Sequence, residues 1–165
     1  MSPKPLAPWD ELHRRAEALP PDRRAAFALA CAEHLVSITA SPRQAELRVA
    51  LARGWAVLDG GSDDLTPLRA QLEGREDVDE DDVAGVYYAL GAVQGSADDA
   101  WWAARRASDA AYERVPYPNG ASIFRPLEAD TASLEVEYEL TWQRQALEAL
   151  EGHEPLPEVV ARLRS

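Results

Sequence analysis

Residues 21–39 read PDRRAAFALACAEHLVSIT, and this stretch decides the type of fold that the rest of the chain must match. Its apolar side chains Phe27, Cys31, Leu35 and Ile38 recur every three or four residues. That spacing matches the period of an α-helix, so these residues share one face. The stretch therefore predicts a helix whose apolar face packs against a core.

On both sides of this stretch, helical spacing returns between residues that begin or end helices. Ser41, Asp79 and Ser96 are side chains of the kind that cap a helix N-terminus, and Gly60 and Gly95 end two helices. The other predicted helices cover residues 9–18, 41–59, 66–73, 80–94, 96–115 and 127–151, and a short one follows Pro157. We expect an all-α, single-domain bundle of about seven or eight helices over residues 1–165, with a flexible lead-in at residues 1–8.

The segment 134–142, LEVEYELTW, is compatible with two structures. Apolar and polar residues alternate in it, which is typical of a strand. The same region also gives a helical stripe of Val136, Leu140, Leu147 and Leu150. It continues without a turn signal into residues of high helix propensity, and a lone strand would lack a partner. These points favour one long helix over residues 127–151.

Residues 116–126, PYPNGASIFRP, form the clearest predicted loop. Three prolines and the pair Asn119-Gly120 cannot continue a helix. We expect the apolar residues Ile123 and Phe124 to pack against the bundle.

The composition is that of a globular protein. The chain has 165 residues, of which 46% are hydrophobic, and this is enough for one core. The longest uncharged apolar run, Val83–Val93, is far shorter than the roughly 20 residues of a membrane span. The first ten residues contain no apolar core of a signal peptide, and the single cysteine, Cys31, cannot form an internal disulfide. We expect a soluble cytoplasmic protein.

Charge is distributed unevenly along the chain. Residues 1–75 contain 10 Lys+Arg and 10 Asp+Glu, whereas residues 76–165 contain 7 Lys+Arg and 19 Asp+Glu. The formal net charge of -12 therefore belongs to the second part. A field of this sign repels nucleic acid and anionic lipid and attracts basic partners. We expect a basic protein partner, and neither nucleic acid nor membrane.

No catalytic, cofactor-binding or metal site is predicted. The three histidines, His13, His34 and His153, fall in separate elements, whereas a zinc site requires several ligands. Cys31 lies on an apolar helix face, where a small buried hydrophobe is the ordinary role. His34 is the nearest residue that could activate it. The sequence contains no nucleophile elbow, phosphate-binding loop or dinucleotide-binding fingerprint.

An acidic run at residues 76–82, EDVDEDD, resembles a calcium loop in composition only. An EF-hand counted from Asp77 requires glycine at its sixth position and glutamate at its twelfth. Asp82 and Tyr88 occupy those positions. Two readings remain open, namely acids that complement a helix dipole and a docking surface for a basic partner. Asp98 and Asp99 repeat the pattern at the next helix start.

Two neighbouring tryptophans, Trp101 and Trp102, cannot both be buried by one helix face. One of them either lies beneath the loop at residues 116–126 or faces a partner, since tryptophan is enriched at binding hot spots. The candidate partner-binding residues are therefore Glu76, Asp77, Asp79, Glu80, Asp81, Asp98, Trp101 and Trp102.

Several segments resemble, in order, the bacterial family called domain of unknown function 416. They are LPPDRRAAFALACAEHL at 19–35, Trp55 within its helix, DVAGVYYAL at 82–90 and VEYELTWQRQALEAL at 136–150. The resemblance covers most of the chain. It implies an all-helical cytosolic protein and favours helix at residues 134–150. It transfers no catalytic residue.

Two classes of function follow from these observations. The first is a non-catalytic acidic interaction protein, in its sharpest form an immunity protein that neutralises a basic antibacterial toxin. A helical binding or assembly module of another role is the alternative. The second class is an enzyme built on carboxylates, for which Glu135, Glu137 and Glu139 are candidates. At two-residue spacing, however, these three fan out around a helix.

Overall fold

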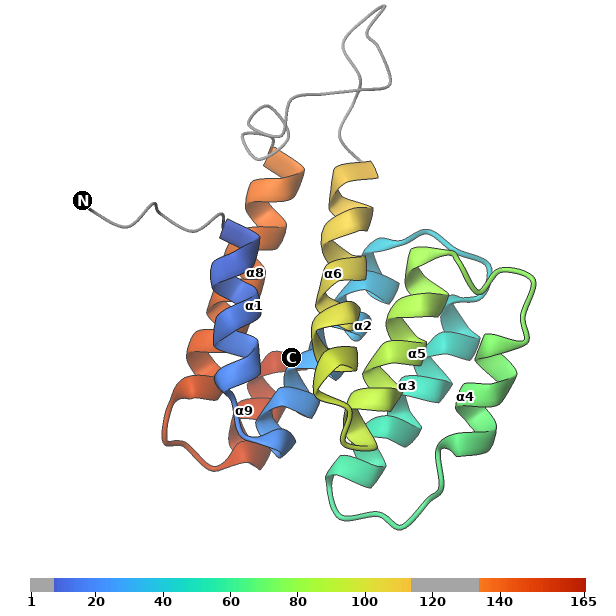
Figure 1. The fold of residues 1–165 in the computed structure, drawn as a ribbon, viewed down its shortest axis with the longest axis horizontal. Helices are drawn as coiled ribbons and strands as arrows, with labels where there is room; N and C mark the ends of the chain where they lie inside the picture. The colour runs from blue at the N-terminus through green and yellow to red at the C-terminus, as the bar shows by residue number, and fades with distance from the viewer. Residues whose placement is uncertain (1–7, 114–133) are drawn as a thin grey trace, which may run out of the picture.

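The computed structural model describes residues 8–113 and 134–165. Helix α2 (Pro21–Ile38) lies at the centre of these residues (Figure 1). Ten of its residues are buried, among them Phe27, Cys31 and Leu35. The helix packs against α1, α3, α5, α6, α8 and α9. The stretch that predicted a helix with one apolar face thus forms a helix surrounded on several sides.

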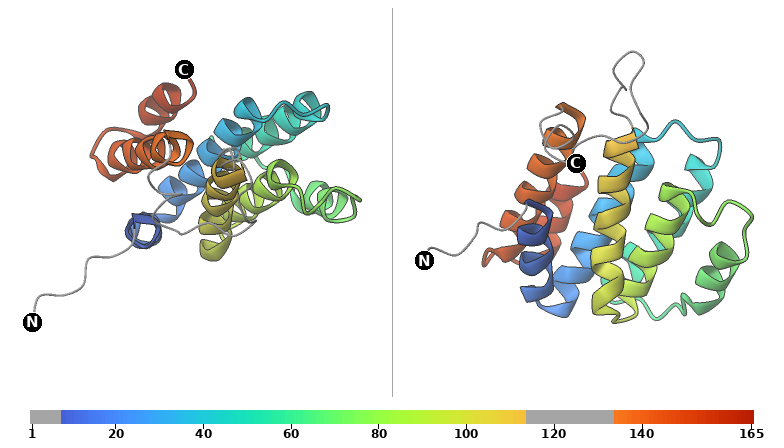
Figure 2. Two further views of the ribbon diagram at one scale, coloured as in Figure 1. Left: turned by 90° about the horizontal axis from the view of Figure 1, so that it is seen from above. Right: turned by 45° about the horizontal axis from the view of Figure 1, so that its top comes forward.

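The described residues form eight helices and no strand. Besides α2, they are α1 (Pro8–Ala18), α3 (Gln44–Leu58), α4 (Thr66–Glu73), α5 (Asp81–Val93), α6 (Ala97–Glu113), α8 (Leu134–Glu151) and α9 (Leu156–Leu163). The predicted all-α, single-domain fold is confirmed. Helices α1, α8 and α9 lie on one side of α2, and α3, α4 and α5 lie on the other (Figures 1 and 2).

Helices α5 and α6 form the closest pair and run in opposite directions, joined by a turn at Gly95 (Figure 1). Gly95 has φ +103°, a left-handed conformation that glycine adopts without strain. At the start of α6, the Ser96 hydroxyl accepts a hydrogen bond from the Asp99 backbone N–H at 3.3 Å. The predicted cap at Ser96 is therefore confirmed.

Two other predicted helix starts are wrong in detail. The residue before α5 is Glu80 rather than Asp79, and no side chain caps this helix. Helix α3 begins at Gln44 rather than at Ser41, and the Ser41 hydroxyl accepts a hydrogen bond from the Arg43 backbone N–H in the turn before it. The predicted helix at 66–73 matches α4, and Asp64 accepts a hydrogen bond from the Thr66 backbone N–H ahead of it.

The region that was ambiguous in sequence is helical from Leu134 to Glu151, so the prediction of helix over strand is confirmed there. The stripe residues Val136, Leu140, Leu147 and Leu150 are all buried. The predicted start of this helix at 127–133, the loop at 116–126 and the lead-in at 1–7 lie outside the described residues. Among the described helices, none combines the length and apolar character that a membrane crossing requires.

Candidate partner-binding site

The two acidic clusters that the sequence singled out lie at opposite ends of the α5–α6 pair. Residues 76–82 lead into the first turn of α5, and Asp98 and Asp99 lie in the first turn of α6. Because the two helices are antiparallel (Figure 1), the clusters are separated by the length of the pair. They do not form one continuous acidic patch.

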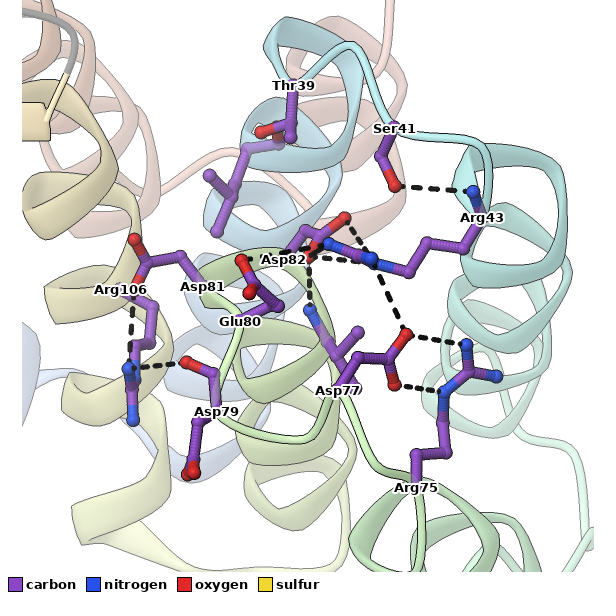
Figure 3. Close-up of polar contacts among 12 residues, drawn as sticks. Thr39, Ser41, Arg43, Arg75, Asp77, Asp79, Glu80, Asp81, Asp82 and Arg106 are labelled. Atoms are coloured by element: carbon purple, nitrogen blue, oxygen red, sulfur yellow. Dashed lines mark hydrogen bonds and ion pairs between the residues drawn. The ribbon is translucent and has the colours of Figure 1, made fainter.

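Asp82 is an internal partner of Arg43. Its side chain is 2% exposed, and Arg43 donates to both carboxylate oxygens, from Nη2 to Oδ1 at 2.9 Å and from Nε to Oδ2 at 3.1 Å (Figure 3). Oδ1 also accepts from the backbone N–H of Val83. A carboxylate in this position fixes the turn before α3 to the start of α5, and it is not available to a partner.

Asp77 is also engaged within the protein. It accepts hydrogen bonds from Arg75 Nε at 2.7 Å and Nη2 at 3.0 Å, and Arg43 Nη1 lies 3.4 Å away (Figure 3). The hydrogen bonds from Arg75 hold the pKa of Asp77 below its usual value. Arg75 further donates to Glu46 of α3 at 2.5 Å. This network ties the loop before α5 to α3.

Asp81 differs from its neighbours because its surroundings disfavour its charge. Arg106 of α6 donates to Asp81 Oδ1 at 3.2 Å and to the carbonyl of Asp79 at 3.4 Å (Figure 3). Burial, with the negative charges of Glu113 and Asp109, nevertheless outweighs Arg106 and raises the pKa of Asp81 to about 6. The end of the α5–α6 pair that holds Asp81 therefore carries more negative charge than Arg106 compensates.

A groove of about 440 Å³ opens at this end of the pair. The C-terminal end of α2 and the turn after it form one wall, with Ile38 and Thr39, and Ala110 of α6 lies opposite. Its charged lining consists of Glu80, Asp81, Asp82 and Glu113, with Arg43 as the one cation. Because Arg43 matches Asp82 and Arg106 reaches Asp81 from outside the lining, the negative charge of the groove in excess of these two arginines comes from Glu80 and Glu113.

Other predicted acids lie on the open surface. Glu76, Asp79 and Asp98 are exposed, and within the described part of the chain they have no ion-pair partner. Glu80 is two-thirds exposed and lies 4.0 Å from Arg43. These four side chains remain accessible to a basic partner, in contrast to Asp77 and Asp82.

The tryptophan pair divides between core and surface. Trp101 is 9% exposed and stacks on His13 of α1, with ring centroids 4.5 Å apart. Trp102 is 49% exposed and lies 6.2 Å from the ring of Tyr88 on α5. Trp101 must therefore be withdrawn from the candidate partner-binding residues, because it contributes to the packing of α1 on α6.

A second groove, of about 570 Å³, lies between α3 and α9. Trp55, Leu58, Leu156 and Val160 make it largely apolar. Asp59 and Arg164 are its charged lining residues, so they leave it without net charge. It is larger than the acidic groove but lacks the charge that would select a basic partner.

A buried polar cluster connects α2, α6 and α8, and the sequence did not predict it. Glu139 and Gln143 of α8 are fully buried, and Gln143 Nε2 donates to Glu139 Oε1 at 2.9 Å and to the Ala104 carbonyl at 3.1 Å. His34 of α2 packs against this pair. Gln143 lies between Leu140 and Leu147 in the apolar stripe of α8. Its place in that stripe was the sequence feature that could have predicted a buried polar side chain.

The single cysteine of the chain, Cys31, feels the charge of Glu139 in this cluster. Burial, with the charge of Glu139, raises the pKa of the Cys31 thiol well above its usual value, so the thiolate nucleophile is suppressed. Among residues 8–113 and 134–165, no three His, Cys, Asp or Glu side chains are grouped so as to hold a metal ion. The hydrogen bonds of Gln143 connect α8 to α6, and the contact of His34 Nε2 with Glu139 Oε2 at 3.1 Å connects α8 to α2.

Comparisons with known proteins identify the fold. No protein-family model matches the chain, and no curated protein matches its sequence. The crystal structure of a DUF416 family protein from Shewanella baltica superposes with a TM-score of 0.74. The match covers 92% of this chain and 90% of that chain, at 20% sequence identity. The resemblance seen in the sequence is thus confirmed in three dimensions: this chain has the fold of a DUF416 family protein.

Proposed function

We propose that this protein is a non-catalytic interaction protein that binds a basic protein partner at the acidic groove of α5 and α6. The observation that carries the proposal is the groove itself, whose lining holds four carboxylates against Arg43, with Arg106 as the further partner of Asp81. In its sharper form, the proposal is that the partner is an antibacterial toxin domain and that the protein acts as its immunity protein.

Electrostatics supports a basic partner in two ways. The net charge of -12 accelerates the encounter with a cationic surface. Once bound, a lysine or arginine in the groove would sit beside Asp81, whose charge burial and neighbouring carboxylates disfavour in the free protein. Such a cation would relieve repulsion that the free protein carries among Asp81, Glu113 and Asp109.

The neutralising role rests on the same site. An inhibitor needs a preformed surface that captures its target quickly, and it needs no catalytic group of its own. Glu80 lines the groove and Asp79 precedes it in the chain, and both are exposed, so they can steer a basic domain towards the groove. An assembly module that binds a basic protein of another role would use these residues in the same way.

The experiment is a binding measurement with basic toxin domains encoded next to the gene for this protein. Association rates are measured by biolayer interferometry between about 50 and 300 mM salt, a range over which screening of exposed charges changes strongly. The variant Asp79→Lys/Glu80→Lys removes exposed groove charge, and Glu73→Lys/Glu148→Lys makes the same change in net charge on α4 and α8. We expect the groove variant to associate at least about tenfold more slowly and with weaker salt dependence.

Two results would reject this function. One is equal slowing of association by the groove variant and by its matched control, which would mean that net charge alone acts. The other is failure of the neighbouring basic domains to bind, together with failure of the protein to rescue cells that express them. Rescue with binding, lost in the groove variant, supports the immunity role.

A further inference from the structure

Trp102 lies in the second turn of α6, towards the end of the α5–α6 pair that holds Asp98. Nearly half of this side chain is exposed, in contrast to the buried Trp101 beside it. Its ring lies 6.2 Å from Tyr88, and Tyr88 lies edge-on to Tyr87 at 5.4 Å. Aromatic side chains of α5 therefore support Trp102 on one side and leave the rest of it in solvent.

The arginines of α4 and α6 around this aromatic surface already have carboxylate partners, and Arg106 also interacts with Tyr88. Arg105 donates to Asp109 at 3.1 Å, and Arg106 to Asp81 at 3.2 Å. Arg69 of α4 pairs with Asp99 at 3.1 Å and covers the ring of Tyr87 at 4.3 Å. Within the described residues, no cation covers the ring of Trp102.

Asp98 supplies a negative charge next to the exposed ring. It lies four residues before Trp102 on α6, a spacing that places two side chains side by side on a helix surface. Asp98 is exposed and has no ion-pair partner in the part of the chain that the structure describes. An open indole face and an unpaired carboxylate thus lie next to each other.

This combination matches one side chain better than others. A guanidinium group stacks flat on an indole and can also donate two hydrogen bonds to a carboxylate. An ammonium group makes the first contact only as a point charge. The chemistry of the pair therefore selects arginine over lysine.

We propose that Trp102 and Asp98 receive an arginine side chain of the basic partner, which stacks on the indole and pairs with the carboxylate. This inference rests on the proposed function for the existence of that partner. It adds a specific contact along α6 from the acidic groove: Asp98 lies in the first turn of α6 and Glu113 at its end, while Trp102 lies one turn before Arg106, the partner of Asp81. Arg106 interacts both with Asp81 of the groove and with Tyr88 beside Trp102. Burial lowers the pKa of Arg106, but its contacts with Asp81 and Tyr88 outweigh burial and raise this pKa above its usual value.

The test uses a hexa-arginine peptide as the probe and the full chain labelled with nitrogen-15. Trp102→Phe identifies the indole N–H resonance of Trp102 among those of the five tryptophans. We expect this resonance to shift saturably with the peptide. Hexalysine should bind about three- to tenfold more weakly at this resonance. Asp98→Asn should weaken the hexa-arginine response, whereas Asp10→Asn on α1 should not.

The role of the ring is tested separately from folding. Trp102→Leu keeps an apolar side chain of moderate size but has no π face, and Trp102→Phe keeps one. Both variants should unfold at similar urea concentrations, and only Trp102→Leu should lose binding of the cognate basic domain by about tenfold or more. A titration that leaves the Trp102 resonance unmoved, or equal affinity of the cognate domain for all three forms, would overturn the inference.

The outcomes separate the two proposals. If the cognate domain binds and Trp102→Leu binds it equally well, the arginine site is rejected and the groove function stands. If the cognate domain binds, the groove variant associates like its matched control and only Trp102→Leu weakens binding, the groove is rejected and the arginine site stands. If no basic domain binds, both proposals are rejected.

Discussion

His34 Nε2 lies 3.1 Å from Glu139 Oε2 in a part of the protein that water does not reach. The imidazole ring stacks on Trp142 with centroids 4.2 Å apart, so α8 holds it with an aromatic ring as well as a carboxylate. Glu139 also accepts a hydrogen bond from Gln143, which reaches the Ala104 carbonyl of α6. One buried carboxylate therefore organises the contact of α8 with α2 and α6.

Removing this carboxylate should destabilise the fold strongly. Glu139→Ala leaves His34 and Gln143 without their partner and opens a cavity, which should cost about 2–4 kcal/mol of the free energy of unfolding. Glu139→Gln keeps the volume and one acceptor, and should cost about 1 kcal/mol. Urea denaturation followed by circular dichroism measures both values.

The matched control for this measurement is Glu137→Ala, two residues earlier on the exposed side of α8. It should change the free energy of unfolding by about 0.5 kcal/mol or less. Equal effects of Ala at 137 and 139 would contradict the role that we assign to Glu139.

The Arg43–Asp82 pair should be the second position at which a single charge matters. Asp82→Ala leaves Arg43 partly buried without its bidentate partner, and we expect a loss of about 2–4 kcal/mol. Glu80→Ala, two residues earlier and largely exposed, should lose about 0.5 kcal/mol or less. If calorimetry shows the two variants melting together, Asp82 is not the anchor of the α3–α5 contact.

Helical periodicity predicted the helices and most of their buried faces because it depends on residues close in sequence. Cys31 and Leu35 are buried as expected, and the stripe from Val136 to Leu150 faces inward. A local pattern also explains why only one of Trp101 and Trp102 is buried. These outcomes require no knowledge of which helices become neighbours.

Local sequence patterns could not tell which acidic residues are paired internally and which are exposed, because their partners are distant in sequence. Asp82 is paired with a residue 39 positions away, and Asp81 with one 25 positions away. In the sequence, Asp77, Asp79, Asp81 and Asp82 form one uniform run. Only tertiary packing divides them into internal partners and exposed charges. Similarly, Glu135, Glu137 and Glu139 look equivalent until α8 is placed against α2.

Cys31 should be inert in the folded protein. Its thiol is fully buried, and burial with the charge of Glu139 raises its pKa, so little reactive thiolate is exposed. Ellman's reagent at pH 8 should react with the native protein only at the rate of unfolding, and at once in 8 M urea. Rapid reaction of the native protein would place the thiol at the surface.

Asp81 should make the stability of the protein depend on pH. Its carboxyl group has a pKa of about 6 in the folded protein, above the ordinary value of 3.8. The folded state therefore holds this proton more tightly than the unfolded state, so its stabilising contribution is complete below about pH 4 and is lost as pH rises to about 6. Two pKa units correspond to about 3 kcal/mol, which partial access of water reduces to about 1–2 kcal/mol.

The variant that isolates this effect is Asp81→Asn, which cannot ionise. Relative to the wild type, Asp81→Asn should gain about 1–2 kcal/mol of stability between about pH 4 and pH 6, and little beyond that range. Glu80→Asn is the control for general charge effects at the same helix start. Urea denaturation at intervals of half a pH unit gives both curves. Parallel curves for Asp81→Asn and the wild type would show that neither burial nor the charges of Glu113 and Asp109 raise the pKa of Asp81. A difference that develops over this range and persists above it would show that Asp81 is ionised at a cost in the free protein, a cost that the cation of a basic partner would reduce.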